Sequence, residues 1–216
     1  MKNIKNLFFD FDGVILDSVK VKDNSFKKLV KKYKKDIRQK FYIYHKRNLG
    51  LSRENKFEYL FTKLLNKKYS TFDKKKINKE FVQINYKGVC KCKFVLGVKK
   101  FLLVNKKLKL FILSGTPEKE LKLLCKEINI SHIFVKILGS PKTKKQHISN
   151  LKVKYKVNST NTLFFGDSIN DYSDAKQLKL NFVQVGNNFK RKDVKLKIKN
   201  FKGKTLNKIN DHFKRI

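Results

Sequence analysis

The chain has 216 residues, and its 54 Lys and Arg residues outnumber its 17 Asp and Glu residues, giving a net charge of +37. Hydrophobic residues make up 40% of it and aromatic residues 12%, which is too much for a chain kept unfolded by charge. The apolar runs are the length of a strand, far short of the roughly 20 residues that span a bilayer, so we expect a soluble protein with one folded core. The N-terminus reaches two aspartates before a signal peptide could form, which predicts a cytoplasmic location. The three cysteines have no extracellular spacing pattern and are expected to be reduced.

The large positive charge raises the possibility of a polyanion partner, because lysines that neutralise nucleic-acid phosphates release counterions. The lysines, however, run along the whole chain and are interleaved with apolar residues at helical spacing, as in residues 26–33. Arg, the better side chain for reading phosphates and base edges, is rare. We therefore interpret the charge mainly as a bias of composition. Nucleic-acid binding is kept as the alternative of another class, and either way the field should attract anionic substrates.

Five short and nearly continuous apolar runs, each ended by turn residues, indicate buried parallel strands. They are residues 6–12, 108–113, 133–138, 162–165 and 181–185. Amphipathic helical patterns lie between them, and Thr116 is expected to cap a helix that Pro117 opens. A weak helical pattern ends the chain, at Leu206, Ile209 and Phe213. Strands that alternate with helices predict an α/β fold with a doubly wound parallel sheet.

The segment between residues 18 and 94 has a different pattern, with successive amphipathic helices and no convincing strand. Its apolar stripes begin at Phe26, Phe57 and Ile77. Ser52 is placed to cap the second of these helices. We therefore expect an α/β core made of residues 1–17 and 95–216, with residues 18–94 inserted after the first strand as a helical cap.

Acidic residues are scarce in this chain, so the places where they cluster are informative. Asp10 and Asp12 close the first predicted strand, while Asp167 and Asp171 follow the fourth. In a doubly wound sheet both pairs would emerge at the carboxyl edge, where ligands bind. Carboxylates that share a site repel one another unless a cation neutralises them, and hard oxygen ligands suit Mg²⁺. Turns and helix caps are the plainer explanation, but Asp10 lies inside an apolar run where a turn residue is not expected.

Four segments, in this order, resemble the motifs of the haloacid dehalogenase superfamily. They are residues 9–14 (FDFDGV), 112–116 (ILSGT), 139–144 (GSPKTK) and 166–171 (GDSIND). The likeness is to the branch that contains phosphoglycolate phosphatase and β-phosphoglucomutase, whose helical cap follows the first motif. The resemblance implies a Rossmann-like core with the cap in the place where the strand-free segment lies.

The resemblance also implies a Mg²⁺-dependent phosphomonoester hydrolase that forms an aspartyl-phosphate. Asp10 would be the nucleophile, and Asp12 the general acid and base. Asp10, the backbone carbonyl of Asp12, Asp167 and Asp171 would hold the metal. Ser114 and the backbone N–H of Gly115 would hold the phosphoryl oxygens at the start of a helix.

A lysine completes the motifs by contacting both the nucleophile and the phosphoryl group, where it stabilises negative charge. Lys144 is our first choice for this catalytic and phosphate-binding role, because it stands in a Gly-Ser-Pro-x-x-Lys arrangement that opens the next helix. Lys142 fits better when residues are counted back from Asp167 without a gap, so both lysines stay candidates.

The substrate is expected to be a small phosphorylated metabolite, with sugar and acidic-sugar phosphates among the candidates. Specificity would come from the cap, and residues 50–57 are the best candidate segment. Arg53 is a rare Arg suited to forked recognition of an anion, and Lys56 follows one turn later. The enzymatic alternative is a phosphate mover of the phosphoglucomutase kind. No membrane partner is expected, and the oligomeric state is left open.

Overall fold

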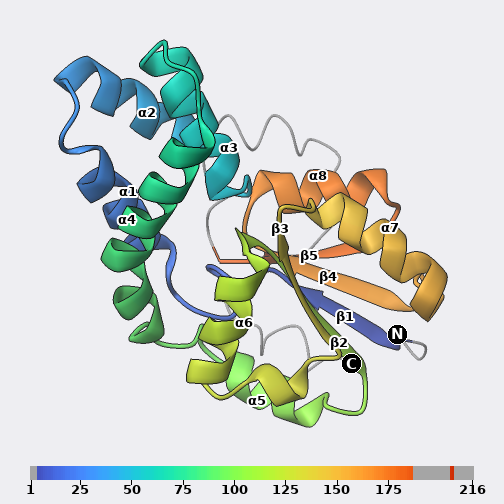
Figure 1. Cartoon of the computed structure of the whole chain (residues 1–216). Coiled ribbons are helices and arrows are strands. Elements are labelled where there is room, and N and C mark those ends of the chain that lie inside the picture. Colours follow the sequence, from blue (N-terminus) through green and yellow to red (C-terminus); the bar gives the residue numbers. More distant parts are fainter. Residues whose placement is uncertain (1–3, 187–204, 207–216) are drawn as a thin grey trace.

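A parallel β-sheet lies at the centre of the computed structural model, which describes residues 4–186 and 205–206 (Figure 1). Its strands are β1 (Asn6–Phe9), β2 (Lys109–Pro117), β3 (Lys136–Ser140), β4 (Thr162–Gly166), β5 (Asn181–Val185) and β6 (Thr205–Leu206). They are ordered β3-β2-β1-β4-β5-β6, and every neighbouring pair is parallel. This confirms the predicted doubly wound sheet, with β1 and β4 side by side at its centre.

Helices cover both faces of this sheet, and a separate group of helices follows β1 in the chain. The first group comprises α5 (Val98–Val104), α6 (Glu118–Glu127), the 3₁₀ turn η2 (Ser131–Ile133), α7 (Lys144–Tyr155) and α8 (Ile169–Gln177). The second comprises α1 (Val19–Val30), α2 (Lys35–Arg47), α3 (Arg53–Tyr59), the π-helical turn η1 (Leu60–Leu64) and α4 (Thr71–Cys90). Figure 1 shows α1 to α4 standing together beside the carboxyl ends of the strands.

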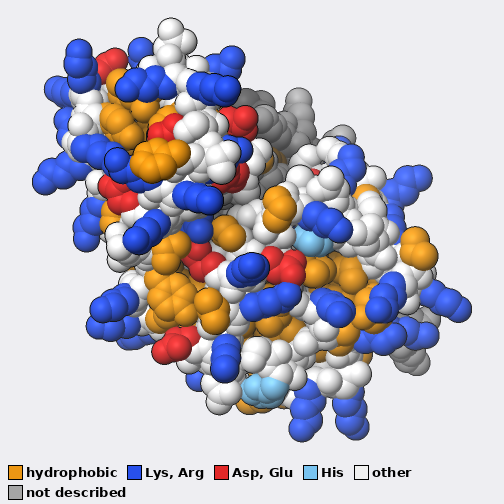
Figure 2. Space-filling view, viewed as in Figure 1, with side chains coloured by type: hydrophobic (Ala, Val, Ile, Leu, Met, Phe, Trp, Pro, Cys, Tyr) orange, Lys and Arg blue, Asp and Glu red, His pale blue; other side chains and the backbone are white. Residues whose placement is uncertain are grey.

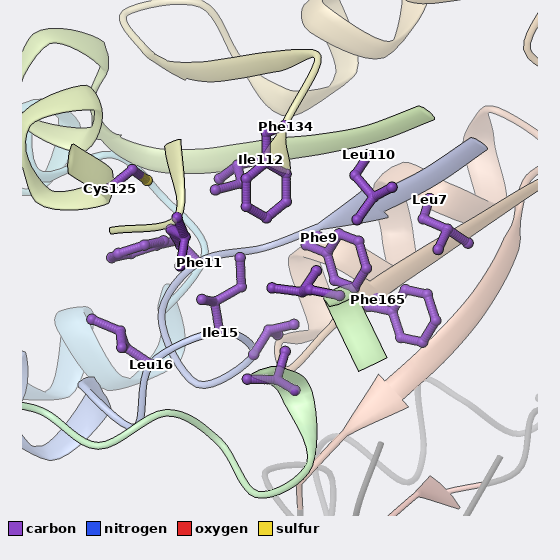
Figure 3. Packing of buried hydrophobic residues seen from close by; sticks show 14 of the residues in the cluster. Leu7, Phe9, Phe11, Ile15, Leu16, Leu110, Ile112, Cys125, Phe134 and Phe165 are labelled. Atoms are coloured by element: carbon purple, nitrogen blue, oxygen red, sulfur yellow. The ribbon is translucent and has the colours of Figure 1, made fainter. Parts of the chain in front are cut away.

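Alternate residues of each strand enter different hydrophobic clusters, because successive side chains of a strand point to opposite faces. Phe9 and Phe165 are stacked, with ring centroids 4.9 Å apart, in the cluster that α5 and α6 cover (Figure 3). Phe8 and Phe164 enter the cluster on the other face, under α7 and α8. Full burial of a side chain of this size contributes about 1.5–3 kcal/mol, so the paired Phe residues fix β1 against β4.

The helices α1 to α4 have a hydrophobic cluster of their own, built around Phe26, Phe41, Phe57 and Phe81. Ser52 caps α3 as predicted, since its Oγ accepts a hydrogen bond from the backbone N–H of Asn55 at 3.3 Å. None of the helices within the described residues combines the length and the apolar character that crossing a membrane requires. The three cysteines are free thiols, as expected.

The structure corrects several expectations about elements. β1 ends at Phe9, before Asp10 and Asp12, and β3 begins only at Lys136 and continues to Ser140. β2 continues through Ser114 and Gly115 to Pro117, where it pairs with Ser140 of β3 after an irregularity in register. As a result α6 begins at Glu118 with Pro117 as its N-cap, and Thr116 does not cap it. Leu206 lies in a strand and not in a helix, while Ile209 and Phe213 lie outside the described residues.

Lys and Arg side chains cover the visible face of the molecule without gathering in one place (Figure 2). They alternate there with apolar and uncharged polar side chains over both groups of helices. On this face the basic side chains form no single stripe.

Candidate active site

Three buried carboxylates meet at the carboxyl edge of the sheet, where β1 and β4 end. Asp10 directly follows β1, and Asp167 and Asp171 follow β4. One oxygen of each carboxylate lies within 4.8 Å of the others, an arrangement that could hold a metal ion. The side chain of Asp12 is not part of this group. The pairing of β1 with β4 therefore brings together acids that are 157 residues or more apart in the sequence.

Two glycines make this close approach possible. Gly13 has a φ of +79°, and a Cβ there would clash with the Asp167 carboxylate. A Cβ on Gly166 would lie 2.5 Å from the Cβ of Asp171. A larger residue at either position would push an acidic side chain out of place, and at Gly13 it would also strain the backbone.

Lys144 lies between two of the three acids. Its Nζ is 2.8 Å from Oδ1 of Asp10 and also contacts Oδ1 of Asp171. Thr143 places Lys144 at the start of α7 through a capping box with Gln146. Lys142, two residues earlier, is exposed. Of the two candidate lysines, the fold thus brings only Lys144 to Asp10.

Asp171 is held so that one oxygen faces Lys144. Its Oδ2 accepts hydrogen bonds from the Oγ of Ser168, at 2.6 Å, and from the backbone N–H of Ser168, at 3.2 Å. In return, Oγ of Ser168 caps α8 by accepting from the N–H of Asp171. Polar contacts therefore run without a break from Ser168 through Asp171 and Lys144 to Asp10. They hold the ammonium group of Lys144 beside Asp10.

The pKa values of these groups reflect the burial of three carboxylates close together. The pKa of Asp10 is raised to about 7: burial raises it most, Lys144 opposes the rise, and Asp171 and Asp12 add to it. The pKa of Asp167 is likewise raised well above its usual value by burial and by Asp10. Burial lowers the pKa of Lys144, but Asp10 and Asp171 outweigh it, so that the net shift is upward. A cluster of carboxylate oxygens of this kind fits a hard divalent cation.

Asp12 is held from the side of α1. The Oγ of Ser18 donates to its Oδ1 at 2.6 Å, and Nζ of Lys22 forms an ion pair with its Oδ2. Lys22 also donates to Oγ1 of Thr116 at 2.7 Å, so this one side chain links α1 to the ends of both β1 and β2. Both oxygens of Asp12 therefore accept hydrogen bonds.

Ser114 and Gly115 lie near the end of β2, where Gly115 is close to the backbone of Gly50 and Leu51. Ser114 is buried, and its Oγ accepts a hydrogen bond from the backbone N–H of Thr116 at 3.1 Å. A Cβ on Gly115 would lie 3.3 Å from the carbonyl oxygen of Leu51. The expectation that these two residues open a helix is wrong, because α6 starts only at Glu118. Their backbone belongs to the extended end of β2.

A cavity of ≈ 80 Å³ lies between this edge of the sheet and the helices α1, α3 and α4. It is lined by most of the residues that the sequence predicts for the site: Asp10, Asp12, Arg53, Lys56, Ser114, Gly115, Lys144 and Asp167. Asp171 does not line the cavity, but its carboxylate contacts Lys144, which does. One side of the cavity is thus made by the sheet edge, with its acidic residues, Lys144 and the end of β2. The other side is made by helices.

The family model for haloacid dehalogenase-like hydrolases matches residues 7–185, which include all four motifs. The chain belongs to the haloacid dehalogenase-like hydrolase family. It is therefore an enzyme of a hydrolase family, and the acidic cluster described above is compatible with the binding of a divalent metal ion. No curated protein is similar enough to the chain to count as a match.

Several solved structures share the fold of this hydrolase. A β-phosphoglucomutase from Clostridium difficile is 19% identical, with a TM-score of 0.69 over 88% of each chain. A predicted phosphatase from Clostridium acetobutylicum is 17% identical, with a TM-score of 0.72 over 99% of this chain and 98% of its own. A predicted phosphoglycolate phosphatase from Haemophilus somnus is 20% identical, with a TM-score of 0.65 over 84% of this chain and 85% of its own. At such identities the likeness shows the fold.

Several residues in the cavity wall of this hydrolase were missed by the sequence reasoning. They are Lys22, Asp23, His45 and Thr116. A signal for the first two exists, since Lys22 and Asp23 precede Phe26 by four and three positions and extend its stripe toward the start of α1. Charged residues on the buried stripe of a helix indicate a polar site. His45 carries no comparable signal, because its partner Asp23 lies on a different helix.

Proposed function

We propose that this hydrolase is a Mg²⁺-dependent phosphatase that hydrolyses a small phosphorylated metabolite through an aspartyl-phosphate on Asp10. The observation that carries the proposal is the position of Lys144, which lies against Asp10 within a group of three buried carboxylates. A carboxylate that is buried beside a fixed ammonium group, and open to a cavity, is suited to attack a bound phosphoryl group.

In the first half of the proposed reaction, a carboxylate oxygen of Asp10 forms a bond to phosphorus while the bond to the ester oxygen breaks. The departing oxygen takes a proton from Asp12. In the second half, Asp12 takes a proton from water, the water oxygen bonds to phosphorus, and the bond to Asp10 breaks. The contacts of Asp12 with Ser18 and Lys22 would hold its carboxyl group in place for both proton transfers.

Lys144, Ser114 and Gly115 would bind the phosphoryl oxygens during both halves. The ammonium group of Lys144 stabilises the negative charge that spreads over these oxygens in the transition state. Ser114, near the end of β2, lines the same cavity. Because the chain of contacts through Ser168 and Asp171 fixes Lys144, little reorganisation is needed when the substrate binds.

Mg²⁺ would be held by Asp10, Asp167 and the backbone carbonyl of Asp12. Asp171, whose carboxylate lies beside those of Asp10 and Asp167, would act on the ion indirectly. The ion would supply positive charge that neutralises both the carboxylates and the phosphoryl oxygens. The chemistry of the donor set supports this assignment, since all donors are oxygens and the pKa of Asp10 and Asp167 is raised by burial and by neighbouring carboxylates.

We propose further that residues 18–94 act as the cap that selects the substrate. Arg53 and Lys56, both expected from the sequence to contact the substrate, line the cavity opposite Asp10. Arg53 also bridges cap and core, because its Nη1 lies 2.7 Å from Oε2 of Glu120 in α6. Closure of this kind excludes water from the site while the substrate is bound.

The purified protein is expected to release phosphate from a simple aryl phosphate when Mg²⁺ is present, and EDTA should reduce the rate to background. Adding Mg²⁺ in excess of EDTA should restore it, which separates metal removal from damage to the protein. Phosphate release can be followed by a colorimetric assay. Full activity in thoroughly metal-stripped protein would contradict the proposed role of the carboxylate group.

A further inference from the structure

The cap side of the cavity contains several charged groups, and nearly all of them are already paired. Lys22 pairs with Asp12, and Arg53 pairs with Glu120. Asp23 is shared between His45, at 2.7 Å, and Lys46, at 2.6 Å. Burial raises the pKa of Asp23, but the hydrogen bonds from His45 and Lys46 outweigh it and lower the pKa, so this carboxylate is ionised and fully engaged.

Lys56 is the exception among the basic side chains that line the cavity. No carboxylate of the described residues lies within salt-bridge distance of its Nζ. Its hydrogen bond is to the carbonyl oxygen of Leu49, at a long 3.4 Å, and the ammonium group lies over the Phe26 ring, 5.2 Å from the centroid. The residue is only 3% exposed.

A buried ammonium group without an anion is unfavourable, because desolvation is not repaid. The pKa of Lys56 is lowered to about 7: burial and the nearby Lys22 lower it, and Asp23 and Asp12, which form no salt bridge with it, only partly oppose the shift. If the residue served only to fill space beside Phe26, a methionine of similar length would do so without this cost. A single anionic group that enters the cavity would supply the missing partner and favour the charged form.

We propose that the ammonium group of Lys56 binds a carboxylate of the substrate, so that the natural substrate is a small phosphomonoester that also carries a carboxylate. This inference rests on the proposed phosphatase function. A carboxylate matches the single charge of one lysine, whereas a second phosphate would call for further donors, and Lys22 and Arg53 are already engaged.

Binding of ω-carboxyalkyl phosphonates tests this directly, because phosphonates are not hydrolysed. A short series of increasing chain length, and the methyl ester of each member, would be titrated into the wild-type protein with Mg²⁺ by calorimetry. We expect the best-fitting acid to bind roughly tenfold or more tightly than its ester, the range for a hydrogen bond to a charged group. In Lys56→Met the ratio of acid to ester affinity should fall to about one, and Lys56→Arg should restore a preference for the acid.

Lys63→Met is the matched control, since Lys63 is an exposed lysine of the cap and its loss changes the net charge equally. It should keep the wild-type ratio, which excludes general attraction by the positive field. Equal binding of acid and ester by the wild type would overturn the inference, and so would an unchanged ratio in Lys56→Met. A ratio lost in Arg53→Ala but kept in Lys56→Met would assign the carboxylate to Arg53 instead. Tighter binding of alkane bisphosphonates than of any acid would overturn the choice of a carboxylate.

The outcome is separable from that of the proposed function. A wild-type protein that hydrolyses aryl phosphate but does not distinguish acid from ester would leave the phosphatase proposal standing and remove the role of Lys56. A protein that prefers the acid but never releases phosphate would leave the role of Lys56 standing and remove the phosphatase proposal. Because the acid-to-ester ratio is measured in the wild type itself, the test does not depend on any variant being folded.

Discussion

Asp10→Asn is expected to abolish the hydrolysis of an aryl phosphate while the protein stays folded. The amide fits the space of the carboxylate, and the backbone N–H of residue 10 keeps its hydrogen bond to the carbonyl oxygen of Phe165 at 2.9 Å. An amide cannot attack phosphorus, so the rate should fall on the order of 10⁴-fold or more, as when other covalent enzymes lose their nucleophile. Phosphate release and a thermal melt, measured on the same preparation, check both halves of the prediction.

Asp17→Asn is the matched control for this variant, because Asp17 is an exposed acid of the same loop. It should retain the wild-type rate. If Asp10→Asn kept a comparable rate, or if Asp17→Asn lost as much activity as Asp10→Asn, Asp10 could not be the nucleophile.

Lys144→Ala is expected to reduce kcat by about 10²–10³-fold, whereas Lys142→Ala should stay near the wild-type value. The magnitude is that of removing one positioned group that stabilises charge in a transition state. Both variants remove one positive charge, and their positions are two residues apart, so a difference between them reflects contact and not the overall field. Lys144 is 6% exposed and lies 2.8 Å from Asp10, while Lys142 is exposed.

Steady-state kinetics with a saturating aryl phosphate would measure these changes. The reverse ranking would move the role to Lys142, and small, equal losses would remove lysine from the mechanism. Loss of Lys144 also leaves the three carboxylates without their buried cation, so its thermal melt should depend more strongly on Mg²⁺ than that of Lys142→Ala.

The parts of this molecule that could be predicted from the sequence are those determined by neighbouring residues. The apolar run before Asp10 is a buried strand because each of its side chains faces one of two hydrophobic clusters. The position of Lys144 has a local signal too, since Thr143 and Gln146 form a capping box that places Lys144 on the first turn of α7.

The remaining features depend on how distant segments pack, and no local pattern encodes that. The ion pair of Arg53 with Glu120 and the contacts of Lys22 with Asp12 and Thr116 join the cap to the core. Whether they form depends on where the cap rests against the sheet. The extension of β2 past Leu113 likewise depends on the pairing of Pro117 with Ser140, two residues that the sequence separates by a whole helix.

The phosphoryl group itself gives the most direct test of covalent chemistry at Asp10. An Asp12→Asn variant mixed with an aryl phosphate whose phosphoryl group is radiolabelled, and quenched with acid, should accumulate label on the protein. A phenolate can leave without a proton, but the attack of water on the aspartyl-phosphate needs a base, so only the second half of the reaction is strongly slowed. We predict that the label lies on the peptide that contains Asp10, and that the double variant with Asp10→Asn carries none. Label on another peptide, or label that passes into free phosphate at every time point without ever residing on the protein, would contradict an aspartyl-phosphate at Asp10.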